Sequence, residues 1–133
     1  MYNILIVDDN PSFVKALELL IRTVLGLKLE VFNFASNGLE AIEKVRSNTH
    51  YDYIFMDANM PLLDGISTTK LINQEFYRDT KIIAVSFDSE FQTIKDMFFS
   101  GASYFICKEE LTFEVLSKIF EEDLAFKGRR AYS

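Results

Sequence analysis

Charged and polar side chains stand directly after several short apolar runs of this chain. Asp8 and Asp9 follow the first run, Asp57 follows another, and Ser86 and Lys108 follow two more. A carboxylate can attack phosphorus and carry a phosphoryl group, and neighbouring carboxylates can hold a divalent cation. A lysine can balance the negative charge that such a transfer brings. These residue types fit phosphoryl transfer onto an aspartate, provided that the fold brings them together.

The apolar runs have the length and composition of buried β-strands, and segments with apolar residues at helical spacing separate them. Short connections and a regular alternation of strand and helix predict a parallel sheet with helices on both faces and right-handed crossovers. The expected fold class is α/β, a single flavodoxin-like (βα)5 domain with a five-stranded parallel sheet of order 2-1-3-4-5. The predicted strands are 3–7, 29–35, 53–56, 81–85 and 103–107.

Capping residues mark where the helices are expected to begin. The predicted N-caps are Asn10, Asn37, Ser89 and Thr112. Ser89 with Gln92 three residues later matches the capping-box pattern. The last helix is expected to end near Phe126. This predicts one domain over residues 1–126 and a polar C-terminal tail over residues 127–133.

The topology predicts where the strand ends meet. The carboxyl ends of parallel strands lie at one edge of a sheet, and this strand order places the first and third strands side by side. Asp8, Asp9 and Asp57 should therefore cluster, with Ser86 and Lys108 beside them. Crowded carboxylates repel one another and need positive charge. Oxygen ligands with room for water suit Mg²⁺, and no His or Cys cluster favours zinc or copper.

Composition argues against several other classes of protein. The 133 residues carry a net charge of −6, which is unfavourable for nucleic-acid binding by this domain. The single cysteine, Cys107, allows no internal disulfide and suits a reducing compartment. No apolar stretch approaches the roughly 20 residues that span a bilayer, and the N-terminus lacks the basic region of a signal peptide. We therefore expect a cytoplasmic protein without a membrane partner.

One segment, MDANMPLLDG over residues 56–65, is specific enough to suggest a family. The other residues that fit the same pattern are Asp8, Asp9, Ser86, Gly101, Ala102, Phe105 and Lys108. Together they resemble a bacterial response-regulator receiver domain of the chemotaxis-regulator type, over about residues 2–126. The resemblance implies a phosphoacceptor of a two-component phosphorelay, which is not an enzyme beyond its own phosphorylation and dephosphorylation.

The resemblance also implies a role for each matching residue. Asp57 resembles the phosphoacceptor, and Lys108 resembles the lysine that contacts the phosphate. Ser86 resembles the switch hydroxyl, and Phe105 stands in the position of the aromatic switch. The implied Mg²⁺ ligands are Asp9, Asp57 and the backbone carbonyl of Asn59, with Asp8 acting mainly through water.

The partners implied by the resemblance are proteins. A histidine kinase or phosphotransfer protein would supply the phosphoryl group, and small phosphodonors often can. The readout would be a face made of the fourth helix, the fifth strand and the fifth helix. That face would contact a downstream protein, an output domain or a second copy of the chain.

Two residues depart from the family pattern. Glu109 follows Lys108 where the family usually has a proline after a cis peptide bond, so the bond is either trans or strained. Phe87 follows Ser86 where the family usually has a small residue, and its ring could narrow access to the site or slow switching. These departures keep open an alternative, a receiver-fold interaction module with weak or no phosphorylation-dependent switching.

Two further readings stay open at the level of sequence. The acids could be helix caps and solvated loop residues, without chemistry. The chain could also be a hydrolase with an aspartyl nucleophile, of the haloacid-dehalogenase-like type. Those enzymes carry Asp-x-Asp after the first strand, whereas this chain has Asp8-Asp9-Asn10 there.

Overall fold

A parallel sheet with helices on both faces forms the molecule. The computed structural model describes residues 1–47, 49–76 and 79–131, and for residues 76 and 124–131 it describes the backbone alone. The five strands are ordered β2-β1-β3-β4-β5, with bounds β1 Tyr2–Val7, β2 Leu29–Ala35, β3 Tyr53–Asp57, β4 Lys81–Ser86 and β5 Tyr104–Cys107. The helices are α1 Pro11–Leu25, α2 Gly38–Arg46, α3 Gly65–Phe76, α4 Phe91–Ser100 and α5 Phe113–Ala131, with 3₁₀ turns η1 Gly26–Lys28 and η2 Lys108–Glu110. The predicted fold class and strand order are confirmed.

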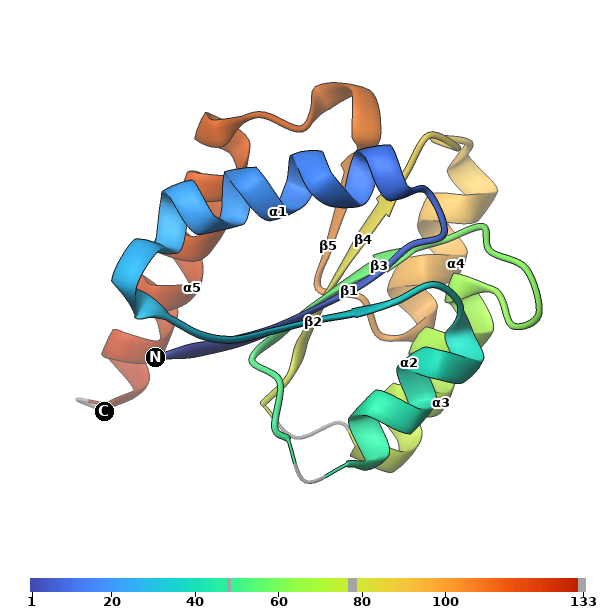
Figure 1. Cartoon of the computed structure of the whole chain (residues 1–133), viewed down its shortest axis with the longest axis horizontal. Coiled ribbons are helices and arrows are strands. Elements are labelled where there is room, and N and C mark those ends of the chain that lie inside the picture. Colours follow the sequence, from blue (N-terminus) through green and yellow to red (C-terminus); the bar gives the residue numbers. More distant parts are fainter. Residues whose placement is uncertain (48, 77–78, 132–133) are drawn as a thin grey trace.

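The sheet separates two hydrophobic cores. Helices α1 and α5 cover one face, and α2, α3 and α4 cover the other (Figure 1). Every residue of β3 is buried, because helices cover both faces of this central strand. The edge strand β2 is only partly buried. The buried strands end in polar side chains at one edge, where the covering helices leave the sheet open to solvent.

Short side chains fix the start of α1 and α5 as the sequence predicts. The Asn10 carboxamide oxygen accepts hydrogen bonds from the backbone N–H groups of Ser12 and Phe13, at 3.1 and 3.2 Å. The Thr112 hydroxyl accepts one from the Val115 N–H at 3.2 Å. These caps satisfy N–H groups that have no partner within the helix. They also fix the first turn of α1 directly beside the end of β1.

The predicted cap of α4 is wrong. The helix begins at Phe91 with Glu90 as its N-cap, so Ser89 lies outside it. The Asp88 carboxylate instead accepts hydrogen bonds from the Glu90 N–H at 3.0 Å and the Thr93 hydroxyl at 2.8 Å. Asp88 binds both donors because each of its two carboxylate oxygens accepts one, and the N-cap Glu90 makes no side-chain capping bond. The loop between β4 and α4 is therefore held by its own side chain.

Helix α5 is longer than predicted, and a side-chain hydrogen bond connects it to the central strand β3. It continues to Ala131 rather than ending near Phe126, while residues 132–133 of the predicted tail lie outside the described residues. The domain boundary near residue 126 stays a prediction. Asp123 of α5 is buried and accepts a hydrogen bond from the Tyr53 hydroxyl of β3. Burial raises the pKa of Tyr53, so the hydroxyl remains the donor of this bond.

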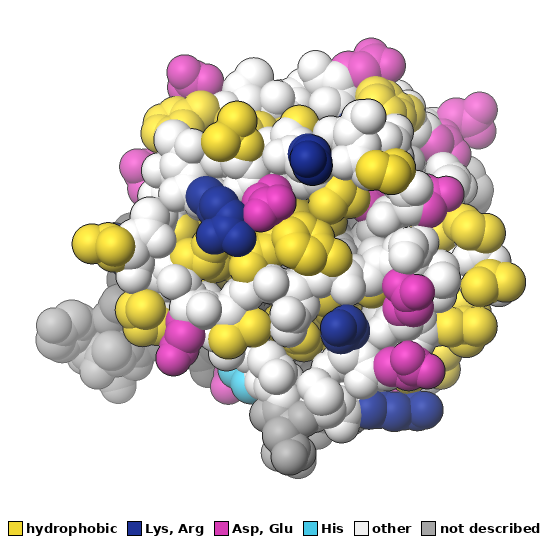
Figure 2. Space-filling view, in the orientation of Figure 1, with side chains coloured by type: hydrophobic (Ala, Val, Ile, Leu, Met, Phe, Trp, Pro, Cys, Tyr) yellow, Lys and Arg dark blue, Asp and Glu magenta, His cyan; other side chains and the backbone are white. Residues whose placement is uncertain are grey.

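The outer surface carries charges of both signs. On the face shown in Figure 2, lysine and arginine side chains stand in small separate groups with acidic side chains between them. Among the helices that the structure describes, none is both long enough and apolar enough to cross a bilayer.

Gly65 lets the start of α3 pack against the end of β3. A Cβ at this position would lie 1.8 Å from the backbone carbonyl oxygen of Asp57, a separation that side-chain atoms cannot reach. The Gly65 N–H also donates to the Ala58 carbonyl at 3.0 Å. The glycine that follows Asp64 in the sequence motif is therefore needed for close approach to Asp57.

We predict that Gly65→Ala lowers the free energy of unfolding by about 1–3 kcal/mol, because backbone atoms must move to admit the methyl group. It should also weaken the stabilisation by Mg²⁺, because the displaced backbone belongs to Asp57. Urea unfolding with and without Mg²⁺ measures both effects. Gly26→Ala is the control for the response to Mg²⁺. The φ of +54° at Gly26 strains an alanine as well, but nothing, Asp57 included, lies within 4 Å of the added Cβ. Equal responses of the two variants to Mg²⁺ would contradict the prediction.

Candidate functional site

Three carboxylates meet at the open edge of the sheet. Asp57 ends β3, and Asp8 directly follows β1, whose Val7 pairs with Met56 of β3. Asp9 comes next in the chain. One carboxylate oxygen from each acid lies within 4.8 Å of the others. Asp8 and Asp57 are buried and Asp9 is exposed, so the cluster has an inner pair and an outer member.

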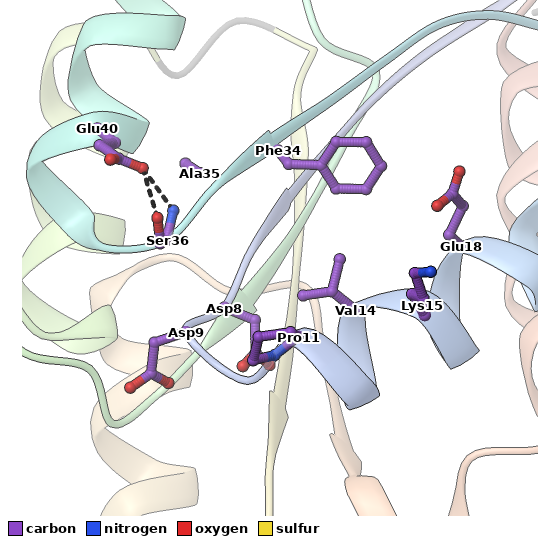
Figure 3. A pocket seen from close by; sticks show the side chains of 10 residues that line it. All are labelled: Asp8, Asp9, Pro11, Val14, Lys15, Glu18, Phe34, Ala35, Ser36 and Glu40. Atoms are coloured by element: carbon purple, nitrogen blue, oxygen red, sulfur yellow. Dashed lines mark hydrogen bonds between the residues drawn. The ribbon is translucent and has the colours of Figure 1, made fainter.

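A pocket of about 370 Å³ between α1 and β2 reaches this cluster from the side. Figure 3 shows Asp8 and Asp9 at its end, where β1 gives way to α1, with Val14 and Phe34 on its walls. At its rim, Ser36 donates two hydrogen bonds to the Glu40 carboxylate, at 2.7 and 2.8 Å (Figure 3). The exposed carboxylate of Asp9 is thus accessible to a hydrated cation from solvent.

Lys108 supplies the positive charge of the site. Its Nζ lies 2.7 Å from Asp8 Oδ2 and 3.7 Å from Asp57 Oδ2. The lysine side chain is 4% exposed, so these charges interact with little screening by water. The sequence predicts Lys108 beside Asp57, whereas its shorter ion pair is with Asp8. Asp8 therefore contacts the lysine directly, in addition to the water-mediated role toward the metal that the resemblance implies.

Asp57 is held in an environment that disfavours its charged form. Burial raises the pKa of its carboxyl group to about 6, and the Asp8 carboxylate adds to the increase. Lys108 and the Asn59 N–H, which donates to Asp57 Oδ1 at 3.4 Å, oppose it. A divalent cation beside Asp57 would lower the pKa of its carboxyl group again.

Two aromatic rings surround the remaining side of the lysine. The centroid of Phe13 lies 4.3 Å from Lys108 Nζ, and that of Phe87 lies 5.2 Å away. Both distances are within the range of cation–π attraction. Phe13 is not among the site residues that the sequence predicts. The available signal was its place in the first turn of α1, directly above the end of β1.

Ser86 and Asn59 lie together at the neighbouring strand end. Ser86 is buried, and its hydroxyl oxygen accepts from the Asp88 N–H at 3.0 Å and the Asn59 side-chain amide at 3.5 Å. A hydroxyl that accepts two bonds retains its own proton for donation. Asn59 is exposed, and its backbone N–H points to Asp57.

Phe105 and Glu109 lie outside the charged cluster. Phe105 is half-buried and packs against the core under α2, α3 and α4. Its two-state switching stays a prediction. Glu109 is exposed in η2, and no peptide bond of the described chain is cis. With a trans bond before Glu109, Lys108 still reaches the carboxylates.

Comparison with known proteins assigns the family. Residues 4–120 match the model of the response regulator receiver domain. The chain belongs to this family, and its Asp8, Asp9 and Asp57 cluster matches the magnesium site of such domains. It is a phosphorelay receiver domain, that is, a phosphoacceptor rather than a conventional enzyme.

Individual relatives come from more than one signalling system. The chain is 41% identical over 91 residues to hybrid signal transduction histidine kinase E of Dictyostelium discoideum, a match that spans 65% of this chain and 5% of that protein. Most of that relative's length therefore has no counterpart in this sequence.

Two solved structures show the same fold. One is the receiver domain of sensor histidine kinase PA1611 from Pseudomonas aeruginosa, with a magnesium ion in its active-site cleft (25% identity, TM-score 0.78, 91% of this chain and 95% of that one). The other is the CheX–CheY complex with beryllofluoride and Mg²⁺ from Borrelia burgdorferi (29% identity, TM-score 0.78, 90% and 87%). Relatives thus include receivers of kinases as well as a chemotaxis regulator, and they define the family rather than a chemotaxis subtype.

The raised pKa of Asp57 predicts that Asp57→Asn increases the free energy of unfolding in a pH-dependent way. Without metal, the folded chain binds the Asp57 proton more tightly than the unfolded chain. The wild-type free energy of unfolding therefore falls as the pH rises from 3.8 to about 6. The variant lacks this loss and should be more stable by about 1–3 kcal/mol above that range, and no more stable below it. Urea unfolding across pH measures this gap; a gap independent of pH would contradict the prediction.

Removal of the Lys108 charge should lower the free energy of unfolding. Lys108→Met leaves Asp8 and Asp57 without their buried counter-charge, and we expect a loss of about 3–5 kcal/mol in metal-free buffer. Mg²⁺ should restore more stability to this variant than to the wild-type chain, because the ion replaces the missing charge. Thermal unfolding with and without Mg²⁺ measures both effects. Lys70→Met, on the exposed side of α3, is the control and should change little; equal losses in both variants would count against the account.

Proposed function

We propose that Asp57 accepts a phosphoryl group from a histidine kinase or phosphotransfer protein. A carboxylate oxygen of Asp57 would form the bond to phosphorus while the bond from phosphorus to the donor imidazole breaks. The imidazole leaves with that electron pair and takes up a proton. The observation that carries this proposal is the cluster of Asp8, Asp9 and Asp57 with Lys108 at the carboxyl edge of the sheet.

Mg²⁺ would neutralise charge on the phosphoryl oxygens when it is bound. Its proposed ligands are Asp8, Asp9, Asp57 and the backbone carbonyl of Asn59. These are hard oxygen donors, and the exposure of Asp9 leaves room for the water molecules that Mg²⁺ retains.

Lys108 and Ser86 would bind the transferred group. The Lys108 ammonium lies 3.7 Å from Asp57, so a phosphoryl group on that carboxylate would come within its reach. The Ser86 hydroxyl already accepts two hydrogen bonds, which supports its proton as a donor to a phosphoryl oxygen. We assign Ser86 the role of switch hydroxyl and Phe105 that of aromatic switch.

The output face would consist of α4, β5 and α5, and it would bind a downstream protein, an output domain or a second copy. Exposed rings on α4 support a protein partner: Phe91 is 78% exposed and Phe99 is 80% exposed. We propose a chemotaxis-regulator type of receiver, acting in the cytoplasm, with a domain of residues 1–126 and a short tail. The similarity to CheY of Borrelia burgdorferi supports the type, and the single Cys107 supports the compartment.

Intact-mass measurement tests the proposed function. Incubated with Mg²⁺ and acetyl phosphate or a cognate kinase, the wild-type chain should gain the mass of one phosphoryl group. Asp57→Asn should not gain it, because an amide cannot form the acyl phosphate. Asp79→Asn, an exposed acid before β4, is the matched control and should be phosphorylated normally. No gain by the wild-type chain at any Mg²⁺ concentration would overturn the proposal.

The second candidate function is an interaction module that does not switch on phosphorylation. Measurement of partner affinity distinguishes it from the first. Phe87 favours it, since its ring contacts Lys108 and is 56% exposed over the site. Beryllofluoride mimics the phosphoryl group, so titrating it should change the affinity for a partner of the α4, β5 and α5 face. Equal affinity with and without beryllofluoride would favour the second candidate.

A further inference from the structure

The ammonium group of Lys108 lies between charge on one side and aromatic rings on the other. Asp8 and Asp57 face it at 2.7 and 3.7 Å. The ring centroids of Phe13 and Phe87 lie 4.3 and 5.2 Å away. With 4% of its side chain exposed, Lys108 has exchanged most of its water for these four groups.

The two rings come from different elements, and each is held in place. Phe13 is in the first turn of α1, where its N–H donates to the Asn10 cap at 3.2 Å. Phe87 follows Ser86, and the next N–H, that of Asp88, donates to the Ser86 hydroxyl at 3.0 Å. The rings meet edge to face, with centroids 6.5 Å apart and planes at 65°. This is a favoured geometry for an aromatic pair.

Phe87 gains little from burial in the core. It is 56% exposed, and its aromatic contacts among the described residues are Phe13 and Lys108. A small residue at this position would leave the lysine open to solvent on that side. The Phe87 ring therefore acts on the lysine more than on the core, whereas the Phe13 ring also packs against the core under α1 and α5.

We propose that Phe13 and Phe87 form an aromatic clamp that positions the Lys108 ammonium for a phosphoryl group on Asp57. The proposal rests on the proposed function, in which Lys108 contacts the phosphoryl oxygens. A ring face attracts a cation without fixing the direction of its N–H bonds. The ammonium can therefore turn from Asp8 toward Asp57 while both rings keep it inside the site. Phe13 and Phe87 are positioning residues, because they act through Lys108.

Nuclear magnetic resonance of the metal-free chain tests the geometry of the clamp. Ring currents should shift the Lys108 methylene signals upfield in the wild-type chain. The shift should diminish in Phe87→Leu and disappear in Phe13→Leu/Phe87→Leu, which keep apolar bulk but lack rings. Phe32→Leu is the control, since the ring of Phe32, on β2, lies 5.0 Å from the Arg22 guanidinium and at the opposite edge of the sheet from β5. Phe87→Leu changes an exposed residue, so the test does not depend on the folding of the double variant.

Beryllofluoride binding in the presence of Mg²⁺ tests the function of the clamp. We expect the dissociation constant to rise about tenfold in the double variant, within the range of a desolvated cation–π contact. Phe87→Tyr keeps a ring and should retain the wild-type affinity, as Phe32→Leu should. A purely structural role would not distinguish tyrosine from leucine at this exposed position.

Two outcomes would overturn the clamp. One is a wild-type chain that binds beryllofluoride but shows no ring-current shift of Lys108. The other is unchanged beryllofluoride affinity in Phe87→Leu and in the double variant, together with faster phosphorylation by acetyl phosphate; the rings would then only block access. A wild-type chain that binds no beryllofluoride at all would contradict the proposed function itself, and the ring-current shift would still report whether the rings hold Lys108.

Discussion

The ion pair between Lys108 and two buried carboxylates is the interaction on which the site depends. Asp8 and Asp57 are both buried, and burial together with the Asp8 carboxylate raises the pKa of Asp57 to about 6 in spite of Lys108. A lone cluster of this kind would lose charge or unfold locally, since uncompensated buried charge is costly. Lys108 Nζ lies 2.7 Å from Asp8 Oδ2 and 3.7 Å from Asp57 Oδ2, and its positive charge lowers the cost of burying these carboxylates. The strand order of the sheet brings these strand ends of opposite charge to one edge.

The same interaction explains how the domain can change state. Lys108 Nζ is closer to Asp8 than to Asp57, at 2.7 against 3.7 Å. A cation bound by the acids would compete with the lysine for Asp8, and a phosphoryl group on Asp57 would attract it. The lysine would then have two alternative sets of partners, which is the condition for a two-state device. The rings of Phe13 and Phe87 contact it in the observed state and would limit how far it moves.

Most of the fold and the charged cluster could be predicted from residue patterns. Strand-like runs that end in Asp8, Asp57, Ser86 and Lys108 place these side chains at one edge by topology alone. The residue patterns could not predict the side-chain contacts that depend on local geometry. Asp88 rather than Ser89 organises the loop before α4, because its carboxylate binds two donors. The preference of Lys108 for Asp8, and its contact with Phe13, depend on side-chain positions that periodicity does not encode.

We expect the Lys108 ammonium to give up its contact with Asp8 and to contact the group carried by Asp57 when the acids bind Mg²⁺. A crystal structure of the full chain with Mg²⁺ and beryllofluoride tests it most directly. We expect beryllofluoride on Asp57 and the Mg²⁺ ion on Asp9 and Asp57. Lys108 Nζ should donate a hydrogen bond to a fluorine atom rather than contact Asp8. An ammonium that stays paired with Asp8 while beryllofluoride occupies Asp57 would contradict it.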